Sequence, residues 1–513
     1  MIPFRGRGRC CLGKYASGLA IFIVFALEIV PAAHSAALPG RLVLCLDGVS
    51  YRDMAALQQG VTYKDIHGRK FHRQAFNRDY FPVSRLVSTF PSISDPSWSE
   101  LLGNQPPPGY QRTYFDADKN SEVSLNGVTS SEEYEEDMTW QMEGGFHRVL
   151  GYIAPQHAFR YEVNNIIKDF LKTRDGRTNY YALIHTTDSA QHLSGDIFSM
   201  LSTLDERLQQ LRTVYRASEG KDLEILLLSD HGNNHAGGGK RVGVRHFLNS
   251  AGYRITKSIR NTNDIVLPTA GIESWIEIHN SPAATETLAR LLTHLKGADI
   301  VTAQRPYPTN QFIVMNSSGE RALIDWDPAK NSFRYSPERG DPIGYIPVVE
   351  ALKKEHVLDS AGFAPSDAWM AETLTNPYPV ALERIVRGHT RVTLNPATFI
   401  VSLKNGYVHS GWIIKRGIAL TKSGGTHGAL DDINSDGILV SSFAPTKDTT
   451  TSRLPALFGG FPGRRDARSL ETAGKLMHSH SKPFPYRLPN LSSSLACIPP
   501  NPPLLKTQMM SPP

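Results

Sequence analysis

The feature that most constrains this chain is a continuous apolar segment that ends near an aspartate, and it occurs three times. The segments and their aspartates are residues 41–46 with Asp47, residues 180–184 with Asp188, and residues 223–228 with Asp230. Apolar runs of this length are typical of strands that are buried on both faces of a parallel sheet. Parallel sheets bind ligands at the edge where their carboxyl ends meet, so we expect the three aspartates to gather there.

The stretches between these segments have the spacing of amphipathic helices. Residues 161–172 precede the second segment, and residues 198–215 carry leucines at helical spacing before the third. Alternating strands and helices predict an α/β fold with a mostly parallel central sheet flanked by helices.

The chain divides into parts by composition and pattern. We predict a catalytic core of residues 38–239 and 412–450, and an intervening region of residues 240–411 that is part core and part inserted cap. The intervening region shows the pattern of one helix and three strands, at residues 283–296, 312–315, 322–325 and 333–335. Residues 451–513 are rich in Pro and Ser and lack apolar periodicity, so we predict a mostly disordered tail.

Residues 1–37 have the layout of a secretory signal peptide. A basic stretch ends at Lys14, an apolar run covers residues 15–30, and small residues follow up to Ala37. Glu28 interrupts the apolar run, which is shorter than the roughly 20 residues of a membrane span. We therefore predict a cleaved signal, a secreted or periplasmic protein, and no stable membrane span after cleavage. The alternative is a protein anchored in the membrane by an uncleaved signal.

Composition narrows the partners and the metal chemistry. A formal net charge of +6 over 513 residues is too weak to indicate binding to a nucleic-acid duplex. Of the four cysteines, Cys10 and Cys11 leave with the signal, Cys45 lies in the first apolar segment, and Cys497 lies in the tail. Any metal must therefore be held by His and Asp. The pattern indicates no particular oligomeric state.

Five short segments carry residue types that bind metals or act as nucleophiles. They are Asp47-Gly48, residues 88–92 (Ser-Thr-Phe-Pro-Ser), residues 188–192 (Asp-Ser-Ala-Gln-His), residues 229–232 (Ser-Asp-His-Gly) and residues 425–428 (Gly-Thr-His-Gly). Singly each is weak, because Asp-Gly is usually a turn and Asp-His often lies in a solvated loop. Their shared position, beside a glycine or at a strand end, makes them candidates for one site.

In this order the five segments resemble the motifs of the alkaline phosphatase superfamily, especially its nucleotide pyrophosphatase/phosphodiesterase branch. Members of that branch show Asp-Gly, Thr-Phe-Pro, Asp-x-x-x-His, Asp-His-Gly and a late His-Gly in the same order. The resemblance spans residues 41–443 in motif order and is specific only around the motifs. Ser92 stands where the branch usually has Asn, and Gln191 replaces a common Gly.

The resemblance implies an alkaline phosphatase-like fold that holds two divalent metal ions, for which zinc is the expected metal. The ligands would be Asp47, Asp230 and His231 for one ion, and Asp188, His192 and His427 for the other. Thr89 would be the nucleophile. Three protein ligands for each ion leave open positions, as a catalytic site requires. Two such metals neutralise charge in a phosphoryl transfer and stabilise both the attacking and the leaving oxygen.

These residues predict a metal-dependent hydrolase of phosphoric esters, a phosphodiesterase or pyrophosphatase that works through a phospho-threonine intermediate on Thr89. The expected substrate is a small phosphate ester such as a nucleotide. A phosphomonoesterase, a phosphonate hydrolase or a phosphotransferase could use the same site, since residues 240–411 would choose the substrate. A non-catalytic surface binding protein is the alternative from a different class. No Cys/Ser-x-Pro-x-Arg segment, the sulfatase signature, occurs at the nucleophile position.

Overall fold

The computed structural model describes residues 37–65, 68–125, 133–142, 150–193, 196–235, 239–269, 271–307, 310–410 and 424–457. These residues all lie within Met1–Pro462, one of two compact units of the chain. The predicted signal peptide, apart from Ala37, and the predicted tail beyond residue 457 lie outside the described residues. Within the described residues, every helix is too short or too polar to cross a membrane.

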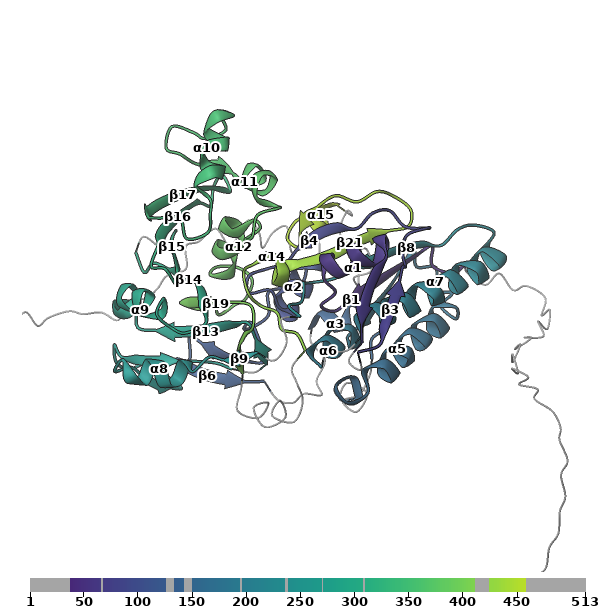
Figure 1. Ribbon diagram of the computed structural model, residues 1–513, viewed down its shortest axis with the longest axis horizontal. Coiled ribbons are helices and arrows are strands. Elements are labelled where there is room, and N and C mark those ends of the chain that lie inside the picture. The colour runs from purple at the N-terminus through teal and green to yellow at the C-terminus, as the bar shows by residue number, and fades with distance from the viewer. Residues whose placement is uncertain are drawn as a thin grey trace, which may run out of the picture. The chain divides into compact units, whose positions relative to one another are not determined.

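One region of the fold is built on a six-stranded sheet (Figure 1). Its strands, in order across the sheet, are β22 (Thr449–Thr450), β4 (Ser84–Val87), β21 (Asp436–Ser441), β8 (Glu224–Leu228), β1 (Arg41–Leu46) and β7 (Asn179–Ile184). β1 lies between β7 and β8 and is parallel to both. The structure therefore confirms that the three apolar segments are neighbouring parallel strands.

Five strands of the complete sheet run in one direction, and β21 runs in the other. β21 runs antiparallel to both of its neighbours, β8 and β4, whereas β22 is parallel to β4. β21 and β22 come from the end of the described chain, after the chain has passed through another sheet. No helical crossover therefore joins β8 directly to β21. The apolar pattern of residues 436–441 does not predict whether this strand runs parallel or antiparallel to its neighbours.

Helices cover both faces of the six-stranded sheet. Alternate residues of a strand point to opposite faces, so Leu44 of β1 joins one apolar cluster and Val43 joins another. The first cluster is closed by α1 (Tyr51–Gln59), α5 (Pro155–Phe170) and α7 (Ile197–Glu219). The second is closed by α2 (Ser94–Leu101), α3 (Glu133–Glu136) and α15 (Leu454–Leu457). The helices predicted at residues 161–172 and 198–215 correspond to α5 and α7.

A second region is built on a nine-stranded sheet (Figure 1). Its strands, in order, are β10 (Arg254–Thr256), β11 (Asp264–Val266), β13 (Trp275–Asn280), β19 (Phe399–Leu403), β14 (Ala298–Gln304), β15 (Gln311–Asn316), β16 (Arg321–Asp327), β17 (Ser332–Arg339) and β18 (Ala364–Pro365). Neighbouring strands are antiparallel except for β10 and β11. The three strands predicted in the intervening region correspond to β15, β16 and β17.

Helices also pack on both faces of the nine-stranded sheet. α8 (Val244–Ser250) and α9 (Thr285–Leu292) close one apolar cluster. α10 (Ile346–Lys354), α11 (Ser366–Thr373) and α12 (Ala381–Gly388) close another. α9 corresponds to the helix predicted at residues 283–296 and follows a 3-10 turn at Pro282–Ala284. This region thus has apolar cores of its own, and a role as a cap over the site remains a prediction.

Short elements complete the described fold. A three-stranded sheet contains β12 (Ile272–Glu273), β20 (Tyr407–Ser410) and β9 (Lys240–Arg241). Two further strand pairs are β2 (Val61–Lys64) with β3 (Lys70–Arg73), and β5 (Thr113–Asp116) with β6 (Ser121–Ser124). Two short helices position the site: α6 (Thr186–His192) follows β7, and α14 (Asp432–Ser435) precedes β21. Residues 412–423 of the predicted catalytic core lie outside the described residues.

Candidate metal centre

The structure brings the six predicted metal ligands together at one edge of the six-stranded sheet. The ends of the neighbouring strands β1 and β8 carry Asp47, Asp230 and His231. Helix α6 carries Asp188 and His192 on adjacent turns, directly after β7. The sixth ligand comes from the segment that precedes α14. All six side chains belong to residues that are at most 9% exposed.

Gly48 allows the strand end to come close to α6. Its φ of +67° lies in the left-handed region, which residues with a Cβ rarely adopt. A Cβ at this position would lie 2.7 Å from Asp188 Oδ1 and 3.2 Å from His231 Cε1. The backbone N–H of Gly48 donates to Asp230 Oδ1 at 3.1 Å. A glycine is therefore required beside Asp47 for the carboxylates to approach each other.

One candidate ligand group consists of Asp188, His192 and His427. One ligand atom from each lies within 4.8 Å of the others. His192 Nε2 is 3.1 Å from Asp188 Oδ2, and His427 Nε2 is 3.7 Å from Asp188 Oδ1. These are the three residues that the sequence predicts for one of the two ions.

The second candidate group differs from the prediction in one member. Ligand atoms of Asp47, Asp188 and His231 lie within 4.8 Å of one another, so Asp188 belongs to both groups. The predicted third ligand, Asp230, lies beside the same imidazole, with its Oδ2 3.3 Å from His231 Nε2. Asp47 Oδ1 is 3.7 Å from that nitrogen. The spacing of motifs along a chain does not show which carboxylate will lie between the two ligand groups in the fold, so it could not predict that Asp188 belongs to both.

Each of the three histidines turns its Nε2 toward the cluster. The Nδ1 atom of His192 is 3.0 Å from the carbonyl oxygen of Gly425, and the Nδ1 atom of His231 is 2.8 Å from the carbonyl oxygen of Gly232. The Nδ1 of His427 is 3.1 Å from the carbonyl oxygen of Ser92. A carbonyl can only accept, so Nδ1 carries the proton in each ring. In the neutral ring Nε2 then has a free lone pair, which is the arrangement of metal-binding histidines.

Two carboxylate oxygens in the cluster fit the requirement of a cation. Asp188 Oδ1 and Asp230 Oδ2 are buried and accept no hydrogen bond among the described residues. A buried carboxylate oxygen without a donor is costly, and a metal ion would remove that cost. Together with the three Nε2 atoms, these oxygens form a donor set of the nitrogen and oxygen type that suits zinc.

Mutual electrostatics shift pKa values within the cluster. Burial opposes ionisation of Asp188, but the neighbouring His192 and His427 outweigh it and hold the pKa of Asp188 below its ordinary value. Burial opposes protonation of His192, yet Asp188 raises the pKa of this histidine to about 9. Asp230 shifts the other way, because burial and the nearby Asp47 raise its pKa. Asp230 therefore resists ionisation where negative charges are crowded.

Two polar side chains that the sequence analysis did not select hold the strand end in place. Gln191 Nε2 donates to the carbonyl oxygen of Gly48 at 2.8 Å, and Thr187 Oγ1 donates to the carbonyl oxygen of Asp47 at 2.7 Å. Both lie on α6, so they fix this helix to the end of β1. The sequence marked Gln191 only as a departure from a common glycine, because its partner is more than a hundred residues away.

Two further ionisable groups, one half-buried and one buried, lie next to the ligands. His185 has its Nδ1 3.6 Å from Asp47 Oδ2 and its Nε2 3.1 Å from Glu135 Oε1. Burial opposes its charge, but Asp47 and Glu135 raise its pKa to about 10. Burial raises the pKa of Glu273 in β12 to about 7, against the lowering effect of His192. The acidic residues around the cluster therefore extend beyond the six predicted ligands.

The predicted nucleophile Thr89 lies in the turn between β4 and α2 and is 3% exposed. Its hydroxyl donates to the carbonyl oxygen of Pro91 at 2.8 Å and lies 2.8 Å from Ser97 Oγ. It also lines a narrow cavity of about 10 Å³ together with Glu383 and Arg384. Among the described residues, no hydrogen bond joins its hydroxyl to any of the six predicted ligands.

A different hydroxyl, at the start of α2, contacts the cluster. Ser94 Oγ donates to Asp47 Oδ1 at 3.1 Å and lies 3.3 Å from His231 Nε2. Ser94 is the first residue of α2 and is partly exposed. A serine just before a helix is ordinarily read as a cap, so local pattern hides its contact with the cluster.

Arg384 of α12 connects the nine-stranded region to this turn. Its buried guanidinium donates to the carbonyl oxygens of Ser88 and Thr89 at 2.9 and 3.1 Å, and to Ser92 Oγ at 3.0 Å. Burial lowers its pKa to about 10. The turn between β4 and α2 is thus held from behind by a charged side chain of the neighbouring region.

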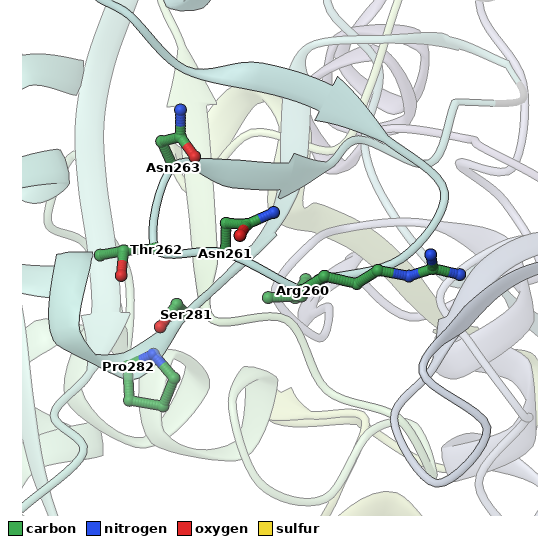
Figure 2. Close-up of a pocket in the computed structure, with 7 residues that line it drawn as sticks. Arg260, Asn261, Thr262, Asn263, Ser281 and Pro282 are labelled. Carbon is green, nitrogen blue, oxygen red and sulfur yellow. The ribbon is translucent and has the colours of Figure 1, made fainter.

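A wide surface pocket of about 620 Å³ lies elsewhere, and Figure 2 shows its lining. Its described lining residues are Ile259, Arg260, Asn261, Thr262, Asn263, Ser281 and Pro282. None of these is an acidic residue or a histidine. Asp264, which follows this loop, accepts from the backbone N–H groups of Arg260 and Asn261 and so holds the loop in its shape. The pocket has no group suited to metal or acid–base chemistry.

Comparisons with known proteins give distant structural likenesses only. No family model matches the sequence, and no curated protein matches it. Human ectonucleotide pyrophosphatase/phosphodiesterase 5 is similar with 11% identity and a TM-score of 0.40, over 84% of this chain and 99% of that chain. The inactive murine protein of the same name, in complex with AMP, is similar with 11% identity and a TM-score of 0.42, over 85% and 99%.

Phosphonoacetate hydrolase from Sinorhizobium meliloti, in complex with phosphonoformate, is similar with 11% identity and a TM-score of 0.42, over 85% of this chain and 93% of that chain. At these TM-scores and identities the likenesses carry no weight for the function of this chain. What the site can do follows from its own residues.

Proposed function

We propose that the protein is a metal-dependent hydrolase of phosphoric esters, a phosphodiesterase or pyrophosphatase with two divalent metal ions, for which zinc is the expected metal. The observation that carries the proposal is the buried cluster itself. Its two unpartnered carboxylate oxygens and its three Nε2 atoms form a donor set for cations at the ends of parallel strands. The order of the five sequence motifs, which resembles the nucleotide pyrophosphatase/phosphodiesterase branch, supports phosphate ester chemistry at such a centre.

The residues of the chain have distinct parts in this chemistry. Asp47, Asp188, Asp230 and the three histidines would hold the metal ions, which supply the positive charge that stabilises phosphoryl transfer when bound. The carbonyl acceptors behind each Nδ1 keep the imidazoles oriented with Nε2 inward. The attacking group is a hydroxyl of the turn between β4 and α2 or of the first residue of α2. The sequence predicts Thr89 for this role, and Ser94, which begins α2, is the hydroxyl that contacts Asp47.

The substrate is a small phosphate ester such as a nucleotide, and the protein acts after export. Phosphomonoesters, phosphonates and phosphoryl acceptors other than water would use the same centre, so relative rates decide among them. Comparing p-nitrophenyl phosphate with bis(p-nitrophenyl) phosphate tests the preference. We expect the diester to be hydrolysed faster, and a faster monoester rate would favour a phosphomonoesterase.

The proposal is tested by metal removal. Purified protein should hydrolyse bis(p-nitrophenyl) phosphate, and a chelator should lower the rate by roughly a hundredfold or more. Loss of a residue that only hydrogen-bonds to a metal ligand already costs about 10–100-fold, and removing the metal should cost at least as much. Added zinc should restore the rate. A rate that ignores the chelator, or no rate after zinc addition, would contradict the proposal.

Two matched substitutions distinguish the loss of a metal ligand from the general effect of replacing a buried carboxylate. Asp188→Asn should lower the rate and the bound zinc together, by roughly a hundredfold or more in rate. Asp205→Asn is the control, because Asp205 of α7 is also buried and also has one unpartnered oxygen, but it lies outside both ligand groups. Asp205→Asn should keep rate and zinc content. If wild-type protein binds zinc and hydrolyses no ester, the non-catalytic binding protein is the better description.

A further inference from the structure

We propose that Ser94, and not the motif threonine Thr89, is the hydroxyl that attacks phosphorus in this protein. The proposal rests on the proposed function, since it names the nucleophile of that same centre. It departs from the assignment that the Thr-Phe-Pro motif implies, and it follows from the contacts of the two hydroxyls.

Ser94 is the hydroxyl that the fold directs at the ligand cluster. Its Oγ lies 3.1 Å from Asp47 Oδ1 and 3.3 Å from His231 Nε2, two ligand atoms of the same candidate group. Its single proton can serve only one of these acceptors at a time. A hydroxyl oxygen between two ligand atoms lies where a cation held by those atoms could contact it.

Thr89 is committed to a structural role in the turn. Its proton goes to the carbonyl oxygen of Pro91, and Ser97 Oγ lies within hydrogen-bonding distance on its other side. Ser97 Oγ in turn lies 2.8 Å from Ser88 Oγ, so three hydroxyls form one short chain behind the turn. Using Thr89 as a nucleophile would break this chain and remove one of the two donors to the carbonyl oxygen of Pro91, the other being the N–H of Ile93.

Access separates the two hydroxyls as well. Ser94 is partly exposed, whereas Thr89 is 3% exposed and faces the narrow cavity lined by Glu383 and Arg384. That cavity measures about 10 Å³, which is room for about one water molecule and too little for a phosphate ester. A phosphate ester can approach Ser94 from the side of the metal ligands.

The start of α2 explains why the serine is placed there. The helix begins at Ser94, and Pro96 lies in its first turn, where a missing N–H leaves no intrahelical bond unmade. Trp98 and Leu101 are buried on its inner face and fix its rotation. The first residue of the helix is therefore held toward Asp47 by the packing of the turns that follow it.

The reaction balances with water as the only co-reactant. In the first step the bond from Ser94 Oγ to phosphorus forms while the bond from phosphorus to the leaving oxygen breaks, and the leaving group takes that electron pair. The hydroxyl proton goes to solvent. In the second step a water oxygen bonds to phosphorus, the bond from Oγ to phosphorus breaks, and one proton of the water restores the serine hydroxyl while the other goes to solvent. Thr89 acts as a positioning residue that keeps the turn closed.

The experiment locates the trapped phosphoryl group and measures metal binding separately. Zinc-loaded full-length protein is mixed with bis(p-nitrophenyl) phosphate, quenched in acid within a turnover, and digested with trypsin. The tryptic peptide of residues 86–112 contains both hydroxyls, and fragmentation before Pro91 separates them by mass. We expect the added mass on Ser94. Zinc affinity is measured in the metal-free proteins by competition with a chromogenic chelator.

Three substitutions complete the test. Ser94→Ala should abolish the label and lower the rate by roughly a thousandfold or more, as loss of a nucleophile does. Its zinc affinity should stay within about tenfold of wild type, less than the loss of a direct ligand would cause. Ser94→Thr, which keeps a hydroxyl, should regain the label. Thr89→Val removes the threonine hydroxyl and should keep the label on Ser94.

Each other outcome is decisive. A label on Thr89, or a label lost only in Thr89→Val, overturns Ser94 and leaves the proposed hydrolase standing. Turnover without any label, at an unchanged rate in Ser94→Ala, overturns a serine nucleophile in favour of direct attack by water. If zinc-loaded wild-type protein gives neither turnover nor label, both this inference and the proposed function fail.

Discussion

The two large regions of this molecule bury ionisable groups in opposite ways. In the nine-stranded region they are satisfied singly, as where His279 Nε2 lies 2.7 Å from Glu277 Oε1. His389 has Thr302 Oγ1 at 2.9 Å on one ring nitrogen and the carbonyl oxygen of Ala397 at 2.9 Å on the other. In the six-stranded region, carboxylates and imidazoles converge on each other. The first arrangement closes a core, whereas the second leaves ligand atoms open.

The unpartnered carboxylate oxygens make the same distinction. Among the described residues, such oxygens belong to Asp188, Asp205, Asp230 and Asp436. All four residues lie in the six-stranded region. Only Asp188 and Asp230 lie beside further acidic and histidine side chains, so only they combine an open oxygen with neighbours that could share a cation. Buried polar groups normally have hydrogen-bond partners. Unpartnered carboxylate oxygens that lie close together therefore indicate a binding site.

The largest effect on stability should come from cutting the link between the two regions. Arg384→Leu removes a buried guanidinium and, with it, donors to the carbonyl oxygens of Ser88, Thr89 and Pro379. We expect the free energy of unfolding to fall by about 4 kcal/mol. Arg391→Leu is the control, because Arg391 is exposed and stacks over the Trp326 ring. It should cost no more than about 1 kcal/mol.

Urea unfolding of both variants measures this. A single transition that shifts as a whole would mean that the two regions unfold together. Two separated transitions in Arg384→Leu would show that the guanidinium is what couples them. If Arg384→Leu had the unfolding free energy of wild type, the hydrogen bonds of Arg384 would not stabilise the contact between the two regions.

The isolated histidine of the nine-stranded region predicts a pH dependence of stability. Burial lowers the pKa of His389 to about 4. The unfolded chain therefore binds this proton first as the pH falls below about 6.5, and the folded state loses stability until the pH reaches about 4. The expected loss is about 3 kcal/mol, from about 1.4 kcal/mol for each pH unit.

His389→Gln can still donate to the carbonyl oxygen of Ala397 and does not titrate. The difference between wild type and this variant, measured by urea unfolding at pH 7 and pH 4.5, isolates the contribution of His389 from that of other buried histidines. Equal pH dependence in both proteins would mean that His389 is not kept neutral by its surroundings.

The smallest predicted effect is the change in unfolding free energy when a buried aspartate is replaced by asparagine. Its sign should be opposite in the two regions. The pKa of Asp230 is raised in the fold, so its stabilising contribution is present at low pH and is lost as the pH rises through the raised pKa. Above that pH the metal-free fold must hold an ionised, crowded carboxylate. Asp230→Asn should therefore stabilise the metal-free protein by about 1–2 kcal/mol at pH 8.

Asp264 of the nine-stranded region should respond in the opposite direction. The side chain of Arg254 and the N–H groups of Arg260 and Asn261, acting against burial, lower its pKa to about 2. Its contribution is present above the ordinary pKa of an aspartate and is lost as the pH falls toward 2, so Asp264→Asn should destabilise at pH 8. Thermal unfolding of the two metal-free variants gives both signs, and a loss of stability in Asp230→Asn would contradict the picture of a strained, cation-accepting cluster.

Local pattern was sufficient for the elements that surround the site. The apolar runs that became β1, β7 and β8 are buried parallel strands, with β1 paired to both of the others. The acidic residues that follow them therefore come together at one edge. The helical spacing of residues 198–215 likewise corresponds to α7, since burying one stripe of leucines requires that periodicity.

Only the tertiary structure decided which atoms meet. The antiparallel direction of β21, the position of Asp188 between two ligand groups, and the contact of Ser94 with Asp47 all depend on residues far apart in the chain. A motif records the types of residue and their order, and these identified the six candidate ligands. It does not record the rotation of α2 or the hydrogen bonds that occupy Thr89, because packing sets these after the chain has folded. The sequence by itself therefore determined the chemistry that is possible at this edge, and the fold determined which hydroxyl faces it.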